Sequence, residues 1–125
     1  MIEVRGLVKR YGGTTVVDDL STGNADVVPE GVPLHEISVH DVATVLTPDA
    51  GFEGVLHFAA KIAAGESVQF PERYYHTNVL GSLALLDAIR AAEVPRMVYR
   101  STAAVYGNPL EVPITEDAVK APTNP

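Results

Sequence analysis

The chain of 125 residues contains no cysteine and no tryptophan. Without cysteine, disulfide bonds, thiolate catalysis and cysteine-ligated zinc are all excluded. The same absence is typical of a reducing compartment, so we expect a cytoplasmic protein. No apolar run approaches the ~20 residues that a membrane-spanning helix needs, and no charged leader followed by an apolar stretch opens the chain. We therefore expect neither a membrane partner nor a secretory signal.

Basic side chains are also scarce, with 9 lysines and arginines against 16 acidic residues, for a net charge of −7. Nucleic-acid phosphates require a basic face, so we expect no nucleic-acid partner. Hydrophobic residues make up 46% of the chain and charged residues 20%, which is the profile of a soluble globular protein. The length supports one domain with a hydrophobic core.

Short apolar and β-branched segments alternate with helical patterns along the chain, which favours an α/β fold with a parallel sheet. Proline spacing and the absence of periodicity predict an extended surface loop over residues 108–125. The pattern predicts strands over residues 2–9, 14–18, 34–39, 54–60 and 96–100, a short helix over 41–46 and a long helix over Pro71 to Val94.

One glycine, Gly81, lies inside the long predicted helix. A glycine in a helix interior costs about 1 kcal/mol relative to alanine. We therefore expect that the helix packs closely against a neighbouring segment at this position.

Ligands of parallel α/β sheets bind beyond the carboxyl ends of the strands. Four segments lie at the carboxyl ends of predicted strands or directly after them: Asp18-Asp19, Ser38-Val39, Phe58-Ala59-Ala60 and Ser101-Thr102. A carboxylate at such a strand end can bind the vicinal hydroxyls of an adenosine ribose, and Asp18 is placed for this role. The alternative is that Asp18 is a turn or capping aspartate.

Several familiar motifs are absent. No glycines have the G-x-G-x-x-G spacing that supplies amide donors to a pyrophosphate, and no lysine is followed by serine or threonine as in a P-loop. His35-Glu36 begins like a zinc motif, but Val39 stands where the second histidine is needed, so we expect no metal site. No tyrosine is followed four residues later by a lysine, so an acid–base Tyr-x-x-x-Lys pair is missing.

Three aromatic side chains have structural interpretations from their sequence positions. His57 lies inside an apolar strand and is interpreted as a hydrogen-bonded core histidine. Tyr74 and Tyr75, on the long helix, are interpreted as core or groove residues.

Six segments between about Val16 and Pro125 have a family's characteristic residues: Asp18–Asn24, His57–Lys61, Gly65–Val68, Tyr74–Val79, Ser101–Gly107 and Val112–Glu116. Together they resemble the UDP-glucose 4-epimerase family. This family is a branch of the extended short-chain dehydrogenases/reductases, which include NAD-dependent epimerases and dehydratases.

This resemblance implies a Rossmann-like, doubly wound parallel sheet that is incomplete in this chain. It also implies NAD as cofactor and a UDP-hexose as substrate. In the family, bound NAD removes hydride from C4 of the sugar, and hydride returns to the other face of the 4-keto intermediate. UDP-galactose and UDP-glucose are thereby interconverted in galactose metabolism.

The resemblance also implies roles for residues at the strand ends. Thr102 would hydrogen-bond the reacting sugar hydroxyl. The cofactor would be held by Asp18 on the adenosine ribose, by Asp19, Leu20, Ser21, Thr22 and Gly23 along the adenine-ribose end, by Ser38 and Val39 beside the adenine, by Phe58, Ala59 and Ala60 at the pyrophosphate and nicotinamide ribose, and by Asn78 from the long helix.

Departures from the family pattern predict a chain that is inactive by itself. Ser38 stands where an aspartate is usual, Ile62 stands where the family has a lysine, and Arg100 replaces a small hydroxyl residue. The first strand with its glycine loop is missing, as are the catalytic Tyr-x-x-x-Lys and the substrate domain. We expect residues 16–125 to form a partial NAD-binding domain.

Other interpretations stay open. One is a noncatalytic module that binds a nucleotide or a partner, by docking or homodimer formation through the Pro71–Val94 helix; another is a sugar-nucleotide dehydratase relative. Residues 1–20 resemble the start of ABC-transporter ATP-binding subunits. We interpret them as an atypical N-terminal segment that replaces the first strand and glycine loop, with residues 2–9 or 14–18 partly filling the gap.

Overall fold

A computed structural model describes residues 13–125 of the chain. It divides into two compact units, the first ending at Ser38 and the second spanning Val39–Pro125. The predicted strand over residues 2–9 lies outside the described residues. The domain boundaries predicted from the sequence stay a prediction.

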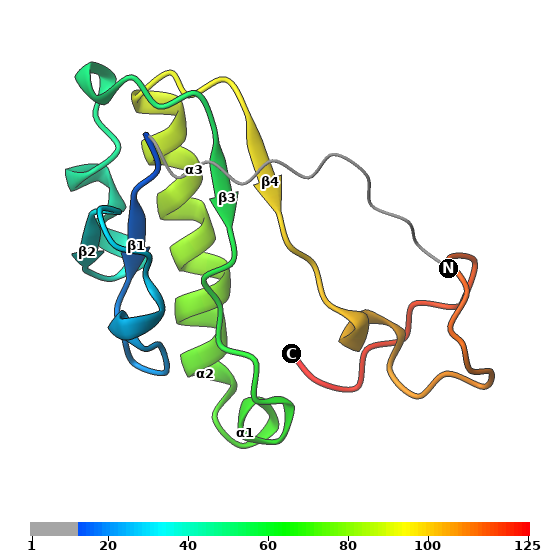
Figure 1. Ribbon diagram of the computed structural model, residues 1–125. Coiled ribbons are helices and arrows are strands. Elements are labelled where there is room, and N and C mark those ends of the chain that lie inside the picture. The colour runs from blue at the N-terminus through cyan, green and yellow to red at the C-terminus, as the bar shows by residue number, and fades with distance from the viewer. Residues whose placement is uncertain (1–12) are drawn as a thin grey trace. The chain divides into compact units, whose positions relative to one another are not determined.

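The described part of the first unit is a parallel pair of short strands, β1 (Val16–Asp18) and β2 (Leu34–Glu36) (Figure 1). The connection between them contains a single 3-10 turn over Ala25–Val27. At the carboxyl end of the pair, Asp18 lies opposite Glu36. The strands predicted over residues 14–18 and 34–39 are thus confirmed, although each is shorter than predicted.

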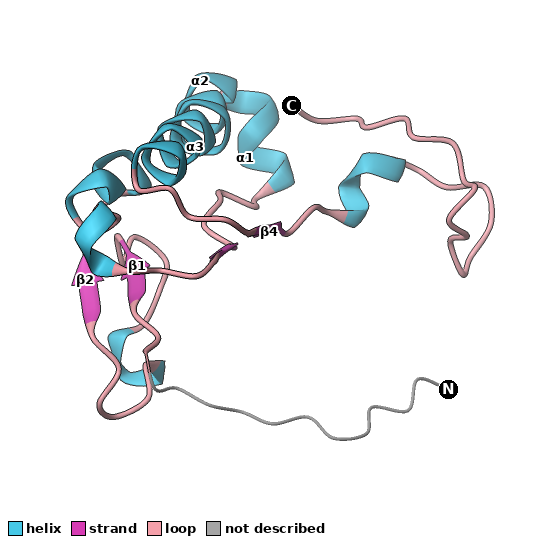
Figure 2. Cartoon of the chain, turned by 90° about the horizontal axis from the view of Figure 1, so that it is seen from above, coloured by secondary structure: helices cyan, strands magenta, loops and turns pink. Residues whose placement is uncertain are grey.

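The second unit holds another parallel pair, β3 (Val55–His57) and β4 (Met97–Tyr99). The backbone N–H of Arg100 donates to the carbonyl of His57 over 3.2 Å, which continues the pairing past the strand end. The strands predicted over 54–60 and 96–100 are confirmed in their centres. A run of helices connects β3 to β4, as the parallel direction of the strands requires (Figure 2).

The long helix predicted over Pro71 to Val94 is continuous but changes its winding. It consists of α2 (Pro71–Tyr74), a π-helical segment η4 (Tyr75–Leu80) and α3 (Gly81–Ala91). Pro71 occupies the first turn, where its missing N–H costs nothing. A preceding short helix, α1 (Ala64–Gln69), was not predicted.

Shorter helical turns complete the second unit. The helix predicted over 41–46 is present as a 3-10 helix displaced by two residues. The 3-10 helices of the second unit are η2 (Val39–Thr44), which is the displaced helix, η3 (Pro48–Ala50) and η5 (Ala103–Tyr106).

The core of the second unit forms where η2 packs against the long helix. At Gly81, an added Cβ would lie 2.6 Å from Cγ1 of Val39, so the close packing predicted for this glycine is confirmed. The buried apolar side chains of the described residues are Val42, Leu46, Tyr74, Leu85, Ala88 and Val94.

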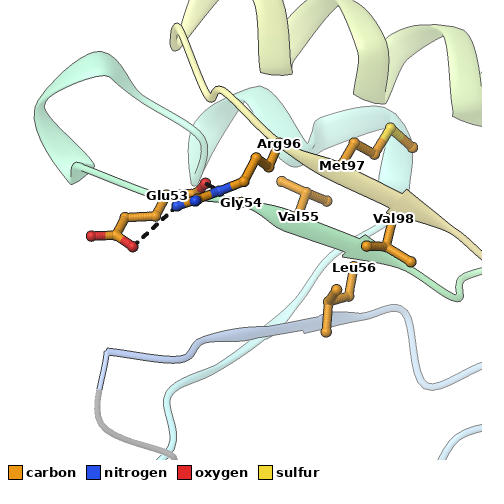
Figure 3. A pocket seen from close by; sticks show the side chains of 7 residues that line it. All are labelled: Glu53, Gly54, Val55, Leu56, Arg96, Met97 and Val98. Atoms are coloured by element: carbon orange, nitrogen blue, oxygen red, sulfur yellow. Dashed lines mark hydrogen bonds and ion pairs between the residues drawn. The ribbon is translucent and has the colours of Figure 1, made fainter.

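One face of the β3–β4 pair is uncovered within the second unit. Leu56 and Val98 are 65% and 56% exposed on it. They line a shallow hollow of about 310 Å³, at whose end Arg96 pairs with Glu53 over 3.3 Å (Figure 3).

The final segment, residues 108–125, has no helix or strand, as predicted. It packs back near Gly107, which has a φ of +60° and whose place no side chain could take because the Ala121 carbonyl lies against it. Along residues 13–125, no helix combines the length and apolarity needed to cross a bilayer.

Candidate cofactor site at the strand ends

The carboxyl edge of the β1–β2 pair brings together the first group of predicted site residues. Asp18 ends β1, and Ser38 lies two residues beyond the end of β2. Because the two strands are parallel and in register, both positions lie at the same edge of the pair. Val39 is the first residue of the second unit.

The loop after β1 folds closely around the Asp18 carboxylate. The backbone N–H of Leu20 donates to Oδ1 of Asp18 over 2.7 Å, and that of Ser21 donates to Oδ1 of Asp19 over 2.9 Å. A Cβ at Gly23 would lie 2.7 Å from Oδ1 of Asp18, so only glycine permits this approach. Asp18 therefore forms the hydrogen bond expected of a turn aspartate, which was the alternative interpretation. That Asp18 also binds an adenosine ribose stays a prediction.

The carboxyl edge of the β3–β4 pair holds the second group. Phe58, Ala59 and Ala60 follow β3 directly and are exposed, with Phe58 at 60%. Thr102 lies three residues after β4, is exposed, and caps η5 by accepting the N–H of Ala104 at Oγ1 over 3.2 Å. The predicted cofactor and substrate contacts of these residues stay predictions.

His57 is a core histidine, as the sequence indicates. Its side chain is 6% exposed, and its Nε2 lies 3.1 Å from Oγ of Ser82 on the long helix. Burial lowers the pKa of its imidazole, so the neutral form is favoured at neutral pH. Tyr74 is likewise buried, at 4% exposure, whereas Tyr75 is 54% exposed.

Asn78 makes a pair of hydrogen bonds that sequence reasoning did not anticipate. Its Oδ1 accepts the backbone N–H of Lys61 over 2.8 Å, and its Nδ2 donates to the carbonyl of Lys61 over 3.0 Å. The side chain thus holds both backbone groups of a single residue in the loop after β3.

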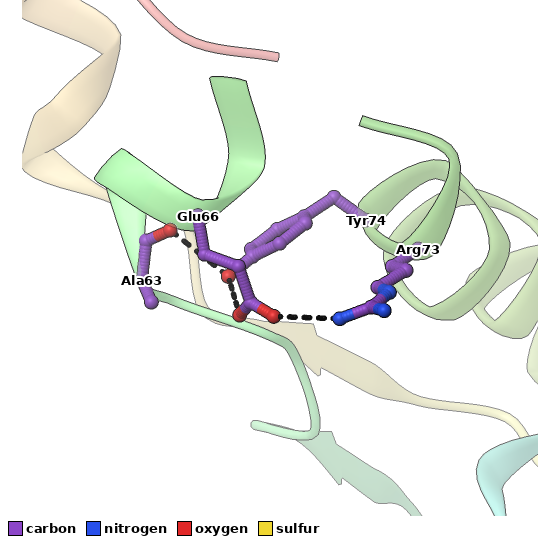
Figure 4. A network of polar contacts seen from close by, with 4 residues as sticks. All are labelled: Ala63, Glu66, Arg73 and Tyr74. Atoms are coloured by element: carbon purple, nitrogen blue, oxygen red, sulfur yellow. Dashed lines mark hydrogen bonds and ion pairs between the residues drawn. The ribbon is translucent and has the colours of Figure 1, made fainter. Parts of the chain in front are cut away.

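A second unpredicted feature is a polar network that joins α1 to α2. The Tyr74 hydroxyl lies 2.9 Å from the Ala63 carbonyl and 2.8 Å from Oε2 of Glu66, and Arg73 pairs with Oε1 of Glu66 over 3.1 Å (Figure 4). The hydrogen bond from Tyr74, followed by the contact with Arg73, lowers the pKa of Glu66. Burial, followed by the bond to Glu66, raises the pKa of Tyr74. Glu66 is therefore the anion and Tyr74 the protonated donor at neutral pH.

Comparison with known proteins places the chain in a family. A sequence model of the family described as GDP-mannose 4,6 dehydratase matches residues 2–125. The chain belongs to that family. The match includes the first residues, whose resemblance to ABC-transporter subunits stays a prediction. It agrees with the arrangement above, in which small and polar residues follow parallel strands.

Several of the similar proteins are epimerases. The chain is 51% identical to the UDP-glucose 4-epimerase of Corynebacterium glutamicum, over 94% of this chain and 36% of that protein. It is 45% identical to that of Streptomyces lividans, over 95% and 37% respectively. The chain therefore spans about a third of the length of these relatives.

Solved structures agree with the sequence relatives. A crystal structure of a UDP-glucose 4-epimerase superposes with a TM-score of 0.79 at 37% identity, covering 88% of this chain and 34% of that one. The Brucella ovis UDP-glucose 4-epimerase in complex with NAD gives a TM-score of 0.78 at 36% identity, with the same coverage. The predicted epimerase resemblance and the partial Rossmann-type α/β fold are thereby confirmed.

Proposed function

We propose that this chain supplies strand-end residues of an NAD site in a UDP-glucose 4-epimerase. The observation that carries the proposal is that the residues matching the family's cofactor motifs lie at the carboxyl ends of parallel strands in both units. The carboxyl edge of a parallel sheet is where its ligands bind. The similarity to an epimerase solved with NAD supports the same cofactor.

The residues at the first edge fit an adenosine ribose. The carboxylate of Asp18 would accept hydrogen bonds from the vicinal hydroxyls, and the closely folded loop from Asp19 to Gly23 would border the adenine-ribose end. Ser38 and Val39 would flank the adenine. Because Ser38 is neutral, its hydroxyl would recognise the base more weakly than a carboxylate.

The residues at the second edge fit the reacting end of the cofactor. When bound, NAD supplies a hydride acceptor for C4 of the UDP-hexose. Phe58, Ala59 and Ala60 would present backbone groups to the pyrophosphate and the nicotinamide ribose, because small side chains leave the backbone open. Thr102 would hydrogen-bond the sugar hydroxyl from its Oγ1, which already lies on the exposed edge.

The acid–base pair that epimerisation requires is missing from the residues of this chain. Epimerisation requires a group that removes and returns the proton of the 4-hydroxyl, and the chain contains no Tyr-x-x-x-Lys pair. We therefore expect the purified chain, mixed with UDP-galactose and NAD, to form no UDP-glucose. Turnover above the level of a heat-denatured sample would contradict this.

Two alternatives predict different observations: a different product in this assay, or association instead of turnover. A sugar-nucleotide dehydratase relative, which the family description favours, would release a 4-keto-6-deoxy sugar nucleotide. A noncatalytic partner-binding module would instead associate through its long helix.

A cytoplasmic location, indicated by the absence of cysteine, stays part of the proposal.

The partner-binding alternative is favoured by an apolar stripe on the long helix. The stripe consists of Tyr75, Val79, Leu83 and Leu86, which are 54%, 47%, 53% and 47% exposed. Their helical spacing aligns them on one side of η4 and α3. An exposed stripe of this kind is suited to pairing with another helix, so homodimer formation or docking on a related chain would occur here.

A further inference from the structure

Three polar side chains of the long helix contact the end of β3 and the chain that follows it. Tyr74, Asn78 and Ser82 are spaced four residues apart. Together they meet the segment from His57 to Ala63 in reverse order, because Tyr74 contacts Ala63, Asn78 contacts Lys61 and Ser82 contacts His57. We call these three side chains the polar seam.

The winding of the helix aligns the seam. In an α-helix, a spacing of four residues overshoots one full turn by about 40°, so three such positions would drift around the cylinder. A π-helical turn contains more residues than an α-helical turn and offsets this drift. The π-helical segment here, Tyr75–Leu80, lies between the first and the last member of the seam.

The hydrogen bond between Ser82 and His57 has a defined direction. The hydroxyl of Ser82 lies 2.6 Å from the carbonyl of Asn78, which can only accept. The single hydroxyl proton of Ser82 is thereby used, so Nε2 of His57 must donate to Oγ of Ser82. Burial lowers the pKa of His57 and favours the neutral ring, and the hydrogen bond to Ser82 places its proton on Nε2.

The loop between the seam contacts has little else to hold it. Phe58, Ala59 and Ala60 are exposed, so burial of their side chains contributes little to the ordering of the backbone. Lys61, by contrast, has both its N–H and its carbonyl bound by Asn78. A residue with both backbone groups held has its conformation fixed at both peptide units.

We propose that the polar seam is a positioning device that fixes the backbone of residues 58–63. The orientation of Phe58–Ala60, the segment expected to face the cofactor, would then be set before any ligand binds. Asn78 acts through the backbone of Lys61, and Tyr74 and Ser82 anchor the two ends of the segment. The cofactor part of this inference rests on the proposed function, whereas the ordering of the loop does not.

Amide hydrogen exchange on the whole chain, measured by NMR, tests the ordering. The variants Asn78→Ala, Tyr74→Phe and Ser82→Ala each remove seam bonds. The matched control is Tyr75→Phe, which removes the same hydroxyl from the adjacent, exposed tyrosine. We expect exchange at Lys61 to become about tenfold faster in Asn78→Ala, since ~1.4 kcal/mol corresponds to a factor of ten. Amides of α3 and of the control should be unchanged.

A variant that unfolds the whole unit is recognised by faster exchange in α3. In that case Asn78→Leu, which keeps a side chain of similar size and loses both the acceptor for the Lys61 N–H and the donor to its carbonyl, replaces Asn78→Ala. The inference is overturned if Lys61 exchanges at the wild-type rate in both Asn78 variants, or if the loop and α3 always change together.

Titration with NAD then separates the two claims. If NAD shifts the Phe58–Ala60 resonances of the wild type, the seam variants should raise the NAD concentration at half-saturation by about fivefold or more, while Tyr75→Phe leaves it unchanged. If NAD shifts nothing in the wild type, the proposed cofactor function fails, and the exchange result still decides the seam.

Discussion

His57 is a single side chain whose environment makes stability depend on pH. Its ring is 6% exposed, and burial lowers its pKa below the ordinary value of 6.5. In the unfolded chain the same ring takes up a proton as the pH falls through that value. In the folded chain the ring takes up the proton only at a lower pH. The unfolded state therefore binds more protons in this range, and stability must fall with the pH.

We expect urea unfolding of the wild type to require less urea at pH 5.5 than at pH 7.5. The loss should begin as the pH falls through about 6.5 and continue until the folded-state pKa is reached. The His57→Gln variant lacks the titrating ring, so its urea midpoint should change less between the two pH values. An equal change in both proteins would show that another group is responsible.

Gly81 is a residue whose missing side chain makes room for Val39. Replacing a helical glycine by alanine stabilises an exposed helix by about 1 kcal/mol, but overpacking a core costs about 1–3 kcal/mol. At a separation of 2.6 Å from Cγ1 of Val39 the second effect should be larger. We expect Gly81→Ala to lower the free energy of unfolding by roughly 1 kcal/mol, measured with urea.

The double variant Gly81→Ala with Val39→Ala is the matched control for this prediction. Removing the methyl groups of Val39 leaves room for the added Cβ. Gly81→Ala should therefore lower the free energy of unfolding less when it is introduced into Val39→Ala than when it is introduced into the wild type. A stabilising Gly81→Ala would contradict the packing seen here.

At the scale of elements, the strands and the long helix could be predicted because their signals are local. A β-branched run predicted β1, a nearly continuous apolar run predicted β3, and a helical repeat with Pro71 at its start predicted the helix. The π-helical segment and α1 could not be predicted. The winding of η4 serves contacts with the loop after β3, and α1 is held by the bond between Tyr74 and Glu66, eight residues apart in sequence.

The apolar stripe of the long helix leads to a prediction about self-association. Leu83→Glu places a charge in the centre of the stripe, and Ala91→Glu places one at an exposed position of α3 outside it. If the stripe pairs with a second copy, sedimentation velocity should show a dimer for the wild type and for Ala91→Glu, and a monomer for Leu83→Glu. Identical sedimentation of all three would contradict pairing through this stripe.

At the scale of the whole molecule, the chain combines a family's strand-end motifs within about a third of the length of its relatives. The sequence predicted that the candidate residues lie at the carboxyl ends of parallel strands, and the structure places them there in each unit. Their role in a cofactor site stays a prediction. The bonds between Asn78 and Lys61 could not be predicted, because they depend on how the helix and the loop are aligned in three dimensions. Motifs thus identified candidate residues, and tertiary packing decided which of them touch.

The most direct test of the account is a titration of the isotopically labelled chain with NAD, followed by NMR. We expect saturable shifts in two segments, Asp18–Gly23 and Phe58–Ala60, with an affinity at or tighter than about 1 mM. Asp18→Asn keeps the turn acceptor and loses the charge, so it should weaken binding by about tenfold, whereas Asp26→Asn, at an exposed position of the same unit, should not. No saturable shift in either segment at about 10 mM NAD would contradict the proposed cofactor site.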